Sequence, residues 1–369
     1  MNSKKTRTKR RILPVLGFLL LILLSVIVIQ NRTFLSVDAI KRAIVYRNLG
    51  QEELAREIAF DSGGNSVFVC LDGGLVAATN RGIAYYGADG ARVLSELFAM
   101  KSPVVMETNG RVLAYDTGGS ALRALDSRSI YCSLEMEAAI LSAQINRNGW
   151  LAVCTEANAA KGLVTVFNGG GQAVYEWFAN RGYLVTAAVS PNNTHMSALI
   201  LTGEGARVVS YSLDNDDEAE SDCLLEGLFC FALYYTSDAT LCAVSDEGIY
   251  FIEGGAVTAS HAFEGASLSA LDVSGNTVLC LKGAASDTLL LLGASGNELA
   301  RKEMEARVVA LSLRGKYLGV LLTDSLMVYK GNLELCAETE EIGDAQDVLM
   351  REDGTAFLIE ATRAVLFVP

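Results

Sequence analysis

Histidine is the usual general base and metal ligand near neutral pH, but this 369-residue chain contains only two, His195 and His261. The first is predicted to begin a strand, and the second to lie in the outer strand of the next repeat unit. The chain has no Gly-x-Ser-x-Gly sequence, and the glycine run at 169–171 lacks the lysine and helix of a phosphate-binding loop. No catalytic or cofactor-binding residue is therefore assigned, which favours a non-catalytic protein but leaves an enzyme open.

The eight cysteines match no zinc or haem spacing, since no Cys-x-x-Cys pair occurs. Cys154, Cys242 and Cys280 fall in the same predicted strand of their repeat units, where a small apolar side chain packs well. A core role is therefore favoured. The alternative for Cys223 and Cys230 is a disulfide between the outer strand of one unit and the inner strand of the next, although these strands should lie at opposite ends of their sheets.

The densest acidic run, residues 214–222, is the one weak candidate for a metal site. Asp214, Asp216 and Glu218 alternate as oxygen ligands of Ca²⁺ do, but the glycine and the distal glutamate of an EF-hand loop are missing. A solvated hairpin tip between the third and fourth strands of a unit is the favoured interpretation. We therefore predict no metal and no cofactor, with calcium at this run as the alternative.

A repeated pattern of turns and strands positions these residues. Beyond residue 60 short apolar runs alternate with Gly, Asn and Asp, and a tight turn followed by an apolar strand recurs at intervals of 37 to 45 residues. Gly and Asn suit such turns because they adopt positive φ at little cost. The markers of the turns are Gly73, Gly110, Gly149, Asn193, Asp238, Gly275, Gly315 and Gly354.

Each repeat has the size of one β-propeller blade. One apolar run precedes each turn and two or three follow it, which gives four antiparallel strands in about 40 residues. The sequence therefore predicts an all-β fold, an eight-bladed β-propeller over residues 52–369, with seven blades as the alternative. Because the last unit ends after its third strand, residues 54–60 are predicted to supply its outer strand and close the ring.

This pattern resembles bacterial membrane-anchored propellers of the WD-repeat-like and quinoprotein-like type, including families of unknown function. The resemblance covers residues 52–369 and implies a fold rather than an activity. The Gly-His and Trp-Asp signatures of WD repeats are absent, and Trp150 and Trp177 are the only tryptophans. The tryptophan docking motifs and cofactor ligands that a resemblance to quinoproteins would imply are also absent.

Residues 12–29 form an uncharged run whose only polar side chain is Ser25. As a helix this run would measure about 27 Å, close to the hydrocarbon core of about 30 Å. The run therefore predicts a single-pass membrane protein. The cations of the short tail 1–11 predict that its N-terminus is cytoplasmic and its propeller extracytoplasmic. Residues 30–51 would form a partly helical stalk. A cleaved signal peptide is the alternative, although the apolar run is longer than usual and is followed by Gln-Asn-Arg.

The chain carries a net charge of −13, and since its first eleven residues contain six cations and no acid, residues 12–369 carry −19. This charge disfavours nucleic acid and other polyanions as partners. A tethered propeller without catalytic signatures is predicted to be a binding or scaffold module at the cell membrane that engages an envelope protein or ligand through its loop faces. The alternatives are a sensor lobe of a membrane complex and an enzyme with a channel-centred carboxylate site.

Overall fold

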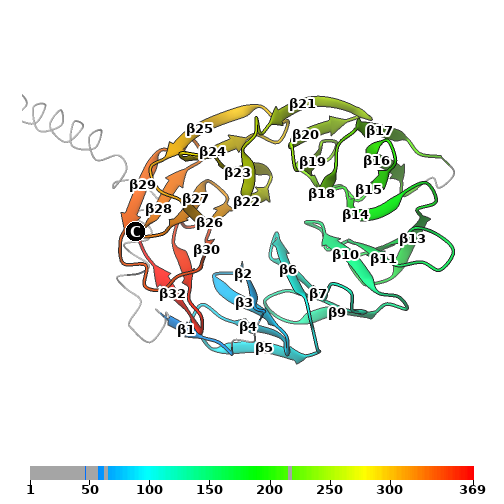
Figure 1. Cartoon of the computed structure of the whole chain (residues 1–369). Coiled ribbons are helices and arrows are strands. Elements are labelled where there is room, and N and C mark those ends of the chain that lie inside the picture. Colours follow the sequence, from blue (N-terminus) through cyan, green and yellow to red (C-terminus); the bar gives the residue numbers. More distant parts are fainter. Residues whose placement is uncertain (1–45, 47–56, 62–64, 215–217) are drawn as a thin grey trace, which may run out of the picture. The chain divides into compact units, whose positions relative to one another are not determined.

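Eight four-stranded antiparallel sheets make up the described part of the chain, and they surround a central channel as the blades of a propeller (Figure 1). The computed structural model describes residues 46, 57–61, 65–214 and 218–369. Over these residues the eight-bladed propeller is confirmed, and the seven-bladed alternative is wrong. The resemblance to known propellers therefore holds for the fold.

The membrane helix expected at residues 12–29 lies outside the described residues, as do the tail 1–11 and the stalk 30–51 except for Tyr46. Among the residues that are described, no helix has the length and apolar character needed to cross a bilayer.

In every blade the strands follow one another in order from the channel to the rim. The innermost strands are β2 (Val67–Leu71), β6 (Pro103–Thr108), β10 (Ile140–Ile145), β14 (Tyr183–Val189), β18 (Cys230–Tyr235), β22 (Ser267–Ser274), β26 (Val308–Arg314) and β30 (Asp347–Met350). The second strands are β3 (Gly74–Thr79), β7 (Arg111–Asp116), β11 (Leu151–Thr155), β15 (His195–Thr202), β19 (Leu241–Ser245), β23 (Asn276–Lys282), β27 (Tyr317–Leu322) and β31 (Ala356–Ile359).

The outer half of each blade completes this order, and the blades are numbered one to eight from β2 onward. The third strands are β4 (Gly82–Tyr86), β8 (Ala121–Leu125), β12 (Leu163–Phe167), β16 (Gly205–Ser212), β20 (Gly248–Glu253), β24 (Asp287–Leu292), β28 (Leu326–Lys330) and β32 (Arg363–Phe367). The outer strands are β5 (Arg92–Leu97), β9 (Ile130–Glu135), β13 (Ala173–Phe178), β17 (Ser221–Glu226), β21 (Ala256–Ala262), β25 (Glu298–Met304), β29 (Leu335–Thr339) and, in blade eight, β1 (Glu57–Ala59).

The eight predicted turns join the innermost strand of each blade to its second strand. Asp72 and Gly73 have φ values of 45° and 80°, and Asn109 and Gly110 have values of 49° and 74°. Two successive positive φ values belong to a type I′ hairpin turn, which matches the twist of the paired strands. Because every blade has the same strand order, all eight turns lie on one side of the propeller, which we call the mouth side.

Each blade packs its two faces against its neighbours. The buried apolar side chains form eight clusters, and every cluster takes its members from two adjacent blades. Cys154, Cys242 and Cys280 are fully buried in second strands within these clusters, as predicted. Burial raises the pKa of the Cys154 and Cys242 thiols to about 12. The alternative disulfide is not formed, since all eight cysteines are free.

The ring closes in blade eight, where the two ends of the propeller meet. β1 runs antiparallel to β32, with Ile58 opposite Ala364, and so supplies the outer strand that the C-terminal unit lacks. The described strand covers only part of the expected segment 54–60. Ile58 is 1% exposed and lies in the cluster shared by blades eight and one. Closure therefore completes an interblade core as well as a sheet.

The closing strand should contribute measurably to the stability of the whole propeller. We expect Ile58→Ala to lower the free energy of unfolding by about 3 kcal/mol, because it removes a buried side chain between two blades. The neighbouring Glu57→Ala should cost less than about 1 kcal/mol, since the 3.1 Å ion pair of Glu57 with Arg363 is exposed. Urea unfolding measures both values.

Removal of the strand tests the same point more severely. A chain that begins at Asp61 should melt at a lower temperature than a chain that begins at Gln51 and keeps β1. Equal melting temperatures and equal cooperativity for the two chains would show that the ring does not need this strand.

Candidate functional site at the channel mouth

A cavity of about 760 Å³ occupies the mouth side of the channel, and we call it the channel cavity. Its wall takes residues from the innermost strands or turns of all eight blades, so no single blade forms it. A second cavity of about 430 Å³ adjoins it between blades seven, eight, one and two. The side chains of Cys70, Asn109 and Arg314 belong to the walls of both cavities.

An ion pair crosses the channel from blade two to blade seven. The Glu107 carboxylate of β6 pairs with the Arg314 guanidinium of β26, in front of blades eight and one. The Glu107 side chain is only 3% exposed, and its Oε1 also accepts a hydrogen bond of 2.7 Å from the Gly110 amide. The buried acid is therefore neutralised by a residue more than 200 positions away in the sequence.

Asp272 lies beside this bridge in the wall of the cavity. Its Oδ2 accepts a hydrogen bond of 2.7 Å from the Leu313 amide of the next blade. Burial raises the pKa of the Asp272 carboxyl to about 6, although the Leu313 amide and the Arg314 charge act in the opposite direction. Burial also raises the pKa of Asp347 on β30, and the two carboxyls repel each other. Asp272 in the wall and Asp347 close to it therefore both resist ionisation.

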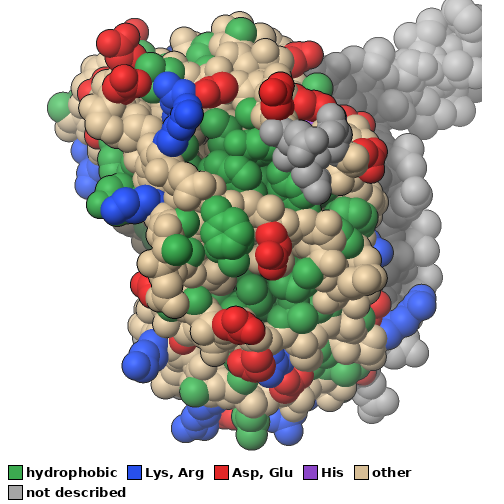
Figure 2. All heavy atoms as spheres, turned by 90° about the vertical axis from the view of Figure 1, so that its right-hand side faces the viewer, with side chains coloured by type: hydrophobic (Ala, Val, Ile, Leu, Met, Phe, Trp, Pro, Cys, Tyr) green, Lys and Arg blue, Asp and Glu red, His purple; other side chains and the backbone are tan. Residues whose placement is uncertain are grey.

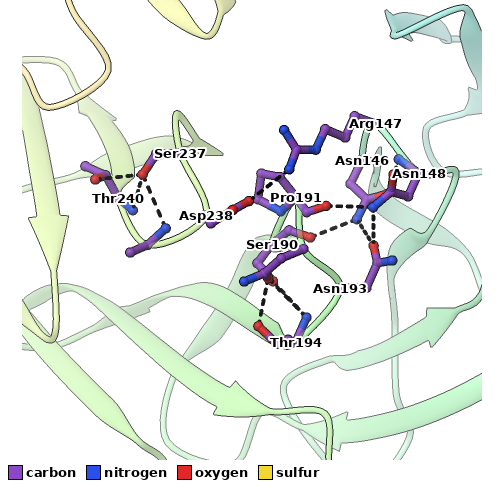
Figure 3. Close-up of polar contacts among 12 residues, drawn as sticks. Asn146, Arg147, Asn148, Ser190, Pro191, Asn193, Thr194, Ser237, Asp238 and Thr240 are labelled. Atoms are coloured by element: carbon purple, nitrogen blue, oxygen red, sulfur yellow. Dashed lines mark hydrogen bonds and ion pairs between the residues drawn. The ribbon is translucent and has the colours of Figure 1, made fainter.

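The rim of the cavity is ordered by side-chain amides in blades three and four (Figure 3). The Asn146 Nδ2 donates to the Ser190 carbonyl at 2.8 Å and to the Asn193 Oδ1 at 2.7 Å. The Asn146 Oδ1 accepts the amides of Asn148 and Trp150 in its own turn. One buried side chain thus fixes two neighbouring mouth turns relative to each other.

A second bridge spans three blades at the rim. Figure 3 shows the Arg147 guanidinium directed past Pro191 of blade four toward Asp238 of blade five, and the two charged groups lie 3.2 Å apart. Both side chains are about half exposed, so a partner at the rim can reach them. Deeper in the channel, the Gln144 Nε2 donates to the Leu233 carbonyl at 2.8 Å, again from blade three to blade five.

The residues that the sequence singled out lie elsewhere. The His195 Nε2 lies 2.7 Å from the Glu220 Oε2, and the His261 Nε2 lies 2.7 Å from the Gly296 carbonyl in the next blade. The histidines thus occupy the expected strands and share no contact.

The calcium alternative stays a prediction. Asp214 and Glu218 are exposed, and Asp216 lies outside the described residues. Within the described ranges no group of three His, Cys, Asp or Glu side chains is placed to hold a metal ion.

Sequence reasoning missed the bridge and the buried acid. A usable signal was present, since Glu107, Asp272 and Arg314 lie within four positions of a mouth turn and each is the only charged residue of its innermost strand. This pattern predicts that each of the three residues lies at the channel. It does not show which of the eight blades face one another.

Comparisons with known proteins agree with the fold. A model described as a family of unknown function, DUF5711, matches residues 46–341. No curated protein sequence matches the chain. A crystal structure of a eukaryotic initiation factor is similar with a TM-score of 0.54 and 10% identity, over 85% of each chain. Raptor of Chaetomium thermophilum is similar with a TM-score of 0.52 and 10% identity, over 72% of this chain and 27% of that one. At such identities the similarity shows the fold alone.

The cross-channel ion pair should show strong coupling between its partners. Arg314→Met leaves the Glu107 carboxylate buried without its cation and should lower the free energy of unfolding by about 3 kcal/mol. The double variant with Glu107→Gln should recover part of that loss, because the unpaired charge is gone. A urea-unfolding cycle measures the coupling. Arg147→Ala at the exposed rim pair is the control and should lower the free energy of unfolding by less than about 1 kcal/mol. Additive effects of Arg314→Met and Glu107→Gln on that free energy would contradict the ion pair.

Asp272 should make the propeller less stable as the pH rises from about 4 to about 6. Its carboxyl keeps a proton up to about pH 6 when folded, against a reference pKa of 3.8. Unfolding therefore releases a proton in this interval, and the free energy of unfolding falls by at most about 3 kcal/mol. Asp272→Asn should remove this fall in urea unfolding at pH 4 and pH 7, whereas Asp238→Asn at the rim should keep it. The same pH dependence in Asp272→Asn and the natural chain would refute the assignment.

Proposed function

The chain belongs to DUF5711, a family of unknown function, and we propose that its propeller is a non-catalytic binding or scaffold module held at the outer face of a cell membrane. In this proposal residues 12–29 are the anchor, and the channel mouth engages an envelope protein or ligand. Propellers suit this role because their sheets stay stiff while their loops gather on two faces.

The observation that carries the proposal is the pre-ordered rim around the channel cavity. Asn146 holds the turns of two blades together, and Arg147 and Asp238 present opposite charges at the rim without being buried. A partner that meets such a surface loses little side-chain entropy on ordering it. The charges inside the cavity are already paired or hydrogen-bonded, as Glu107 and Asp272 illustrate. This arrangement favours recognition over chemistry.

An enzyme with a channel-centred carboxylate site is the second candidate. It is favoured by the raised pKa values of Asp272 and Asp347, since burial moves the pKa of a carboxyl toward the range in which it can exchange a proton with a substrate. The sensor-lobe alternative shares the anchor and the rim with the first proposal. It differs only in requiring that partner binding be transmitted through the membrane helix.

Membrane retention tests the anchor. The full chain with a C-terminal tag should stay with the membranes through a carbonate wash, because an apolar run of this length inserts stably. Release of a fragment shortened by some 39 residues would show instead that the N-terminal segment is a cleaved signal.

Crosslinking in intact membranes tests the mouth. The tagged natural chain should enrich an envelope component, and Arg147→Glu should lose it because the reversed charge faces Asp238. Arg128→Glu is the matched control, since Arg128 is exposed on the same side of the propeller but lies in the outer part of blade two. Equal capture by the natural chain and both variants would place the contact with the envelope component away from the channel mouth. Capture that is lost when Asp272 is changed would favour the enzyme candidate.

A further inference from the structure

We propose that a second binding surface, on the side of the propeller opposite the mouth, takes a protein segment that combines apolar side chains with lysine or arginine. The surface consists of Phe178, Tyr183, Phe229 and Phe231, which we call the aromatic patch. Their exposed fractions are 48%, 64%, 56% and 44%, which is high for aromatic side chains of a folded domain.

The four residues lie at the two connections that lead into and out of blade four. Tyr183 begins β14 and pairs with Leu201, next to the hairpin between β15 and β16. On the other side of that hairpin, the Ala206 amide donates to the Leu228 carbonyl at 2.9 Å and the Gly227 amide to the Glu204 carbonyl at 2.8 Å. The two aromatic pairs therefore flank one hairpin.

These side chains do not belong to the core. None of them is a member of the eight interblade clusters or of the side chains packed against those clusters. Phe231 is the extra residue of a bulge, because the pairing of β18 with β19 shifts between Cys230 and Ala232. Covering such a ring removes apolar surface from water and therefore favours binding. A gathering of exposed aromatic rings is typical of a binding surface rather than of a bare one.

The charges around the patch select the partner. Glu226, Asp246 and Glu247 are exposed, and none of their carboxylates has an ion pair or a hydrogen bond with another described residue, although the Glu247 amide donates to the Ser245 hydroxyl. Asp246 follows Ser245, which pairs with Cys230 between the two phenylalanines. Figure 2, which looks at the rim over β13 and β17, shows hydrophobic side chains with acidic side chains among them. Unpaired carboxylates beside apolar rings complement a segment that is both apolar and basic.

The same charges disfavour the other occupants. A second copy of this chain would bring like charges together, and anionic lipid would be repelled by a domain whose sequence from residue 12 carries −19. Two cations lie on the Tyr183 side of the patch, since the Lys161 Nζ lies 4.8 Å from the centre of the Tyr183 ring and Arg181 is exposed in the connection before β14. The basic side chains of the partner are therefore expected beside Phe229 and Phe231, where the carboxylates lie.

The closing strand lies far from the aromatic patch. β1 begins on the mouth side, since Glu57 pairs with Val365 near the end of β32 that points toward that side. This strand belongs to blade eight, which lies across the ring from blade four (Figure 1).

Matched peptides test the proposal on the full chain in phosphatidylcholine nanodiscs, with empty nanodiscs as the blank. The probes are three labelled peptides of equal length: one alternating leucine and lysine, one with leucine and glutamate, and one with serine and lysine. Fluorescence anisotropy should show that the leucine–lysine peptide binds at least about tenfold more tightly than the other two. Similar affinity for the leucine–glutamate peptide would overturn the proposal.

Variants locate the contact. The double variant Phe229→Ser with Phe231→Ser should bind the leucine–lysine peptide about tenfold or more weakly than the natural chain. The triple variant Glu226→Gln with Asp246→Asn and Glu247→Gln should also bind the peptide more weakly, and its affinity should depend less on salt concentration. The control is Leu299→Ser with Glu303→Gln on β25, where an apolar and an acidic side chain are also exposed. All variants should keep the melting temperature, since the changed side chains lie at the surface.

The remaining outcomes each decide against the proposal. Equal binding by the patch and control variants would mean unspecific attraction to an acidic protein. Sedimentation that shows a dimer lost with Phe229→Ser and Phe231→Ser would assign the patch to a second copy. Tighter binding to phosphatidylglycerol vesicles than to the peptide would assign it to a membrane. The mouth proposal stands or falls separately, because its variants lie on the other side.

Discussion

Every blade of this propeller has two apolar faces and can bury them only against the next blade, so the structure depends on closing the ring. The eight interblade clusters are the physical form of that constraint, and no cluster is complete within one blade. The cluster between blades eight and one requires Ile58, which comes from the other end of the chain. A strand of three residues therefore completes both a sheet and an interblade core.

Closure into eight blades also sets the chemistry of the channel. The innermost strands leave a cavity of about 760 Å³, and charged side chains that enter it find partners in their own, neighbouring or distant blades. Glu107 forms an ion pair with Arg314 across the channel. Asp272 instead accepts hydrogen bonds from backbone amides, and its burial raises the pKa of its carboxyl. Low solvation makes each unpaired charge costly. The charged side chains of the cavity wall are consequently paired or hydrogen-bonded.

The two sides of the propeller differ in physical character. The mouth side carries amides and bridged charges that are ordered by hydrogen bonds, with Asn146 at their centre. The opposite side of blade four carries exposed rings such as Phe229 beside carboxylates such as Asp246. A propeller with two unlike faces can hold two different partners at once, as a scaffold does.

The sequence by itself determined the repeat and the turns, because pairs such as Asp72–Gly73 and Asn109–Gly110 adopt positive φ through local backbone preference. It also determined the missing outer strand, because the last repeat ends after its third apolar run. It also placed Cys154 in a core strand from apolar pattern alone. Only the tertiary structure decided that Glu107 meets Arg314 and that burial raises the pKa of Asp272, because blades that face one another across a ring are far apart in the chain and burial is a property of the closed channel.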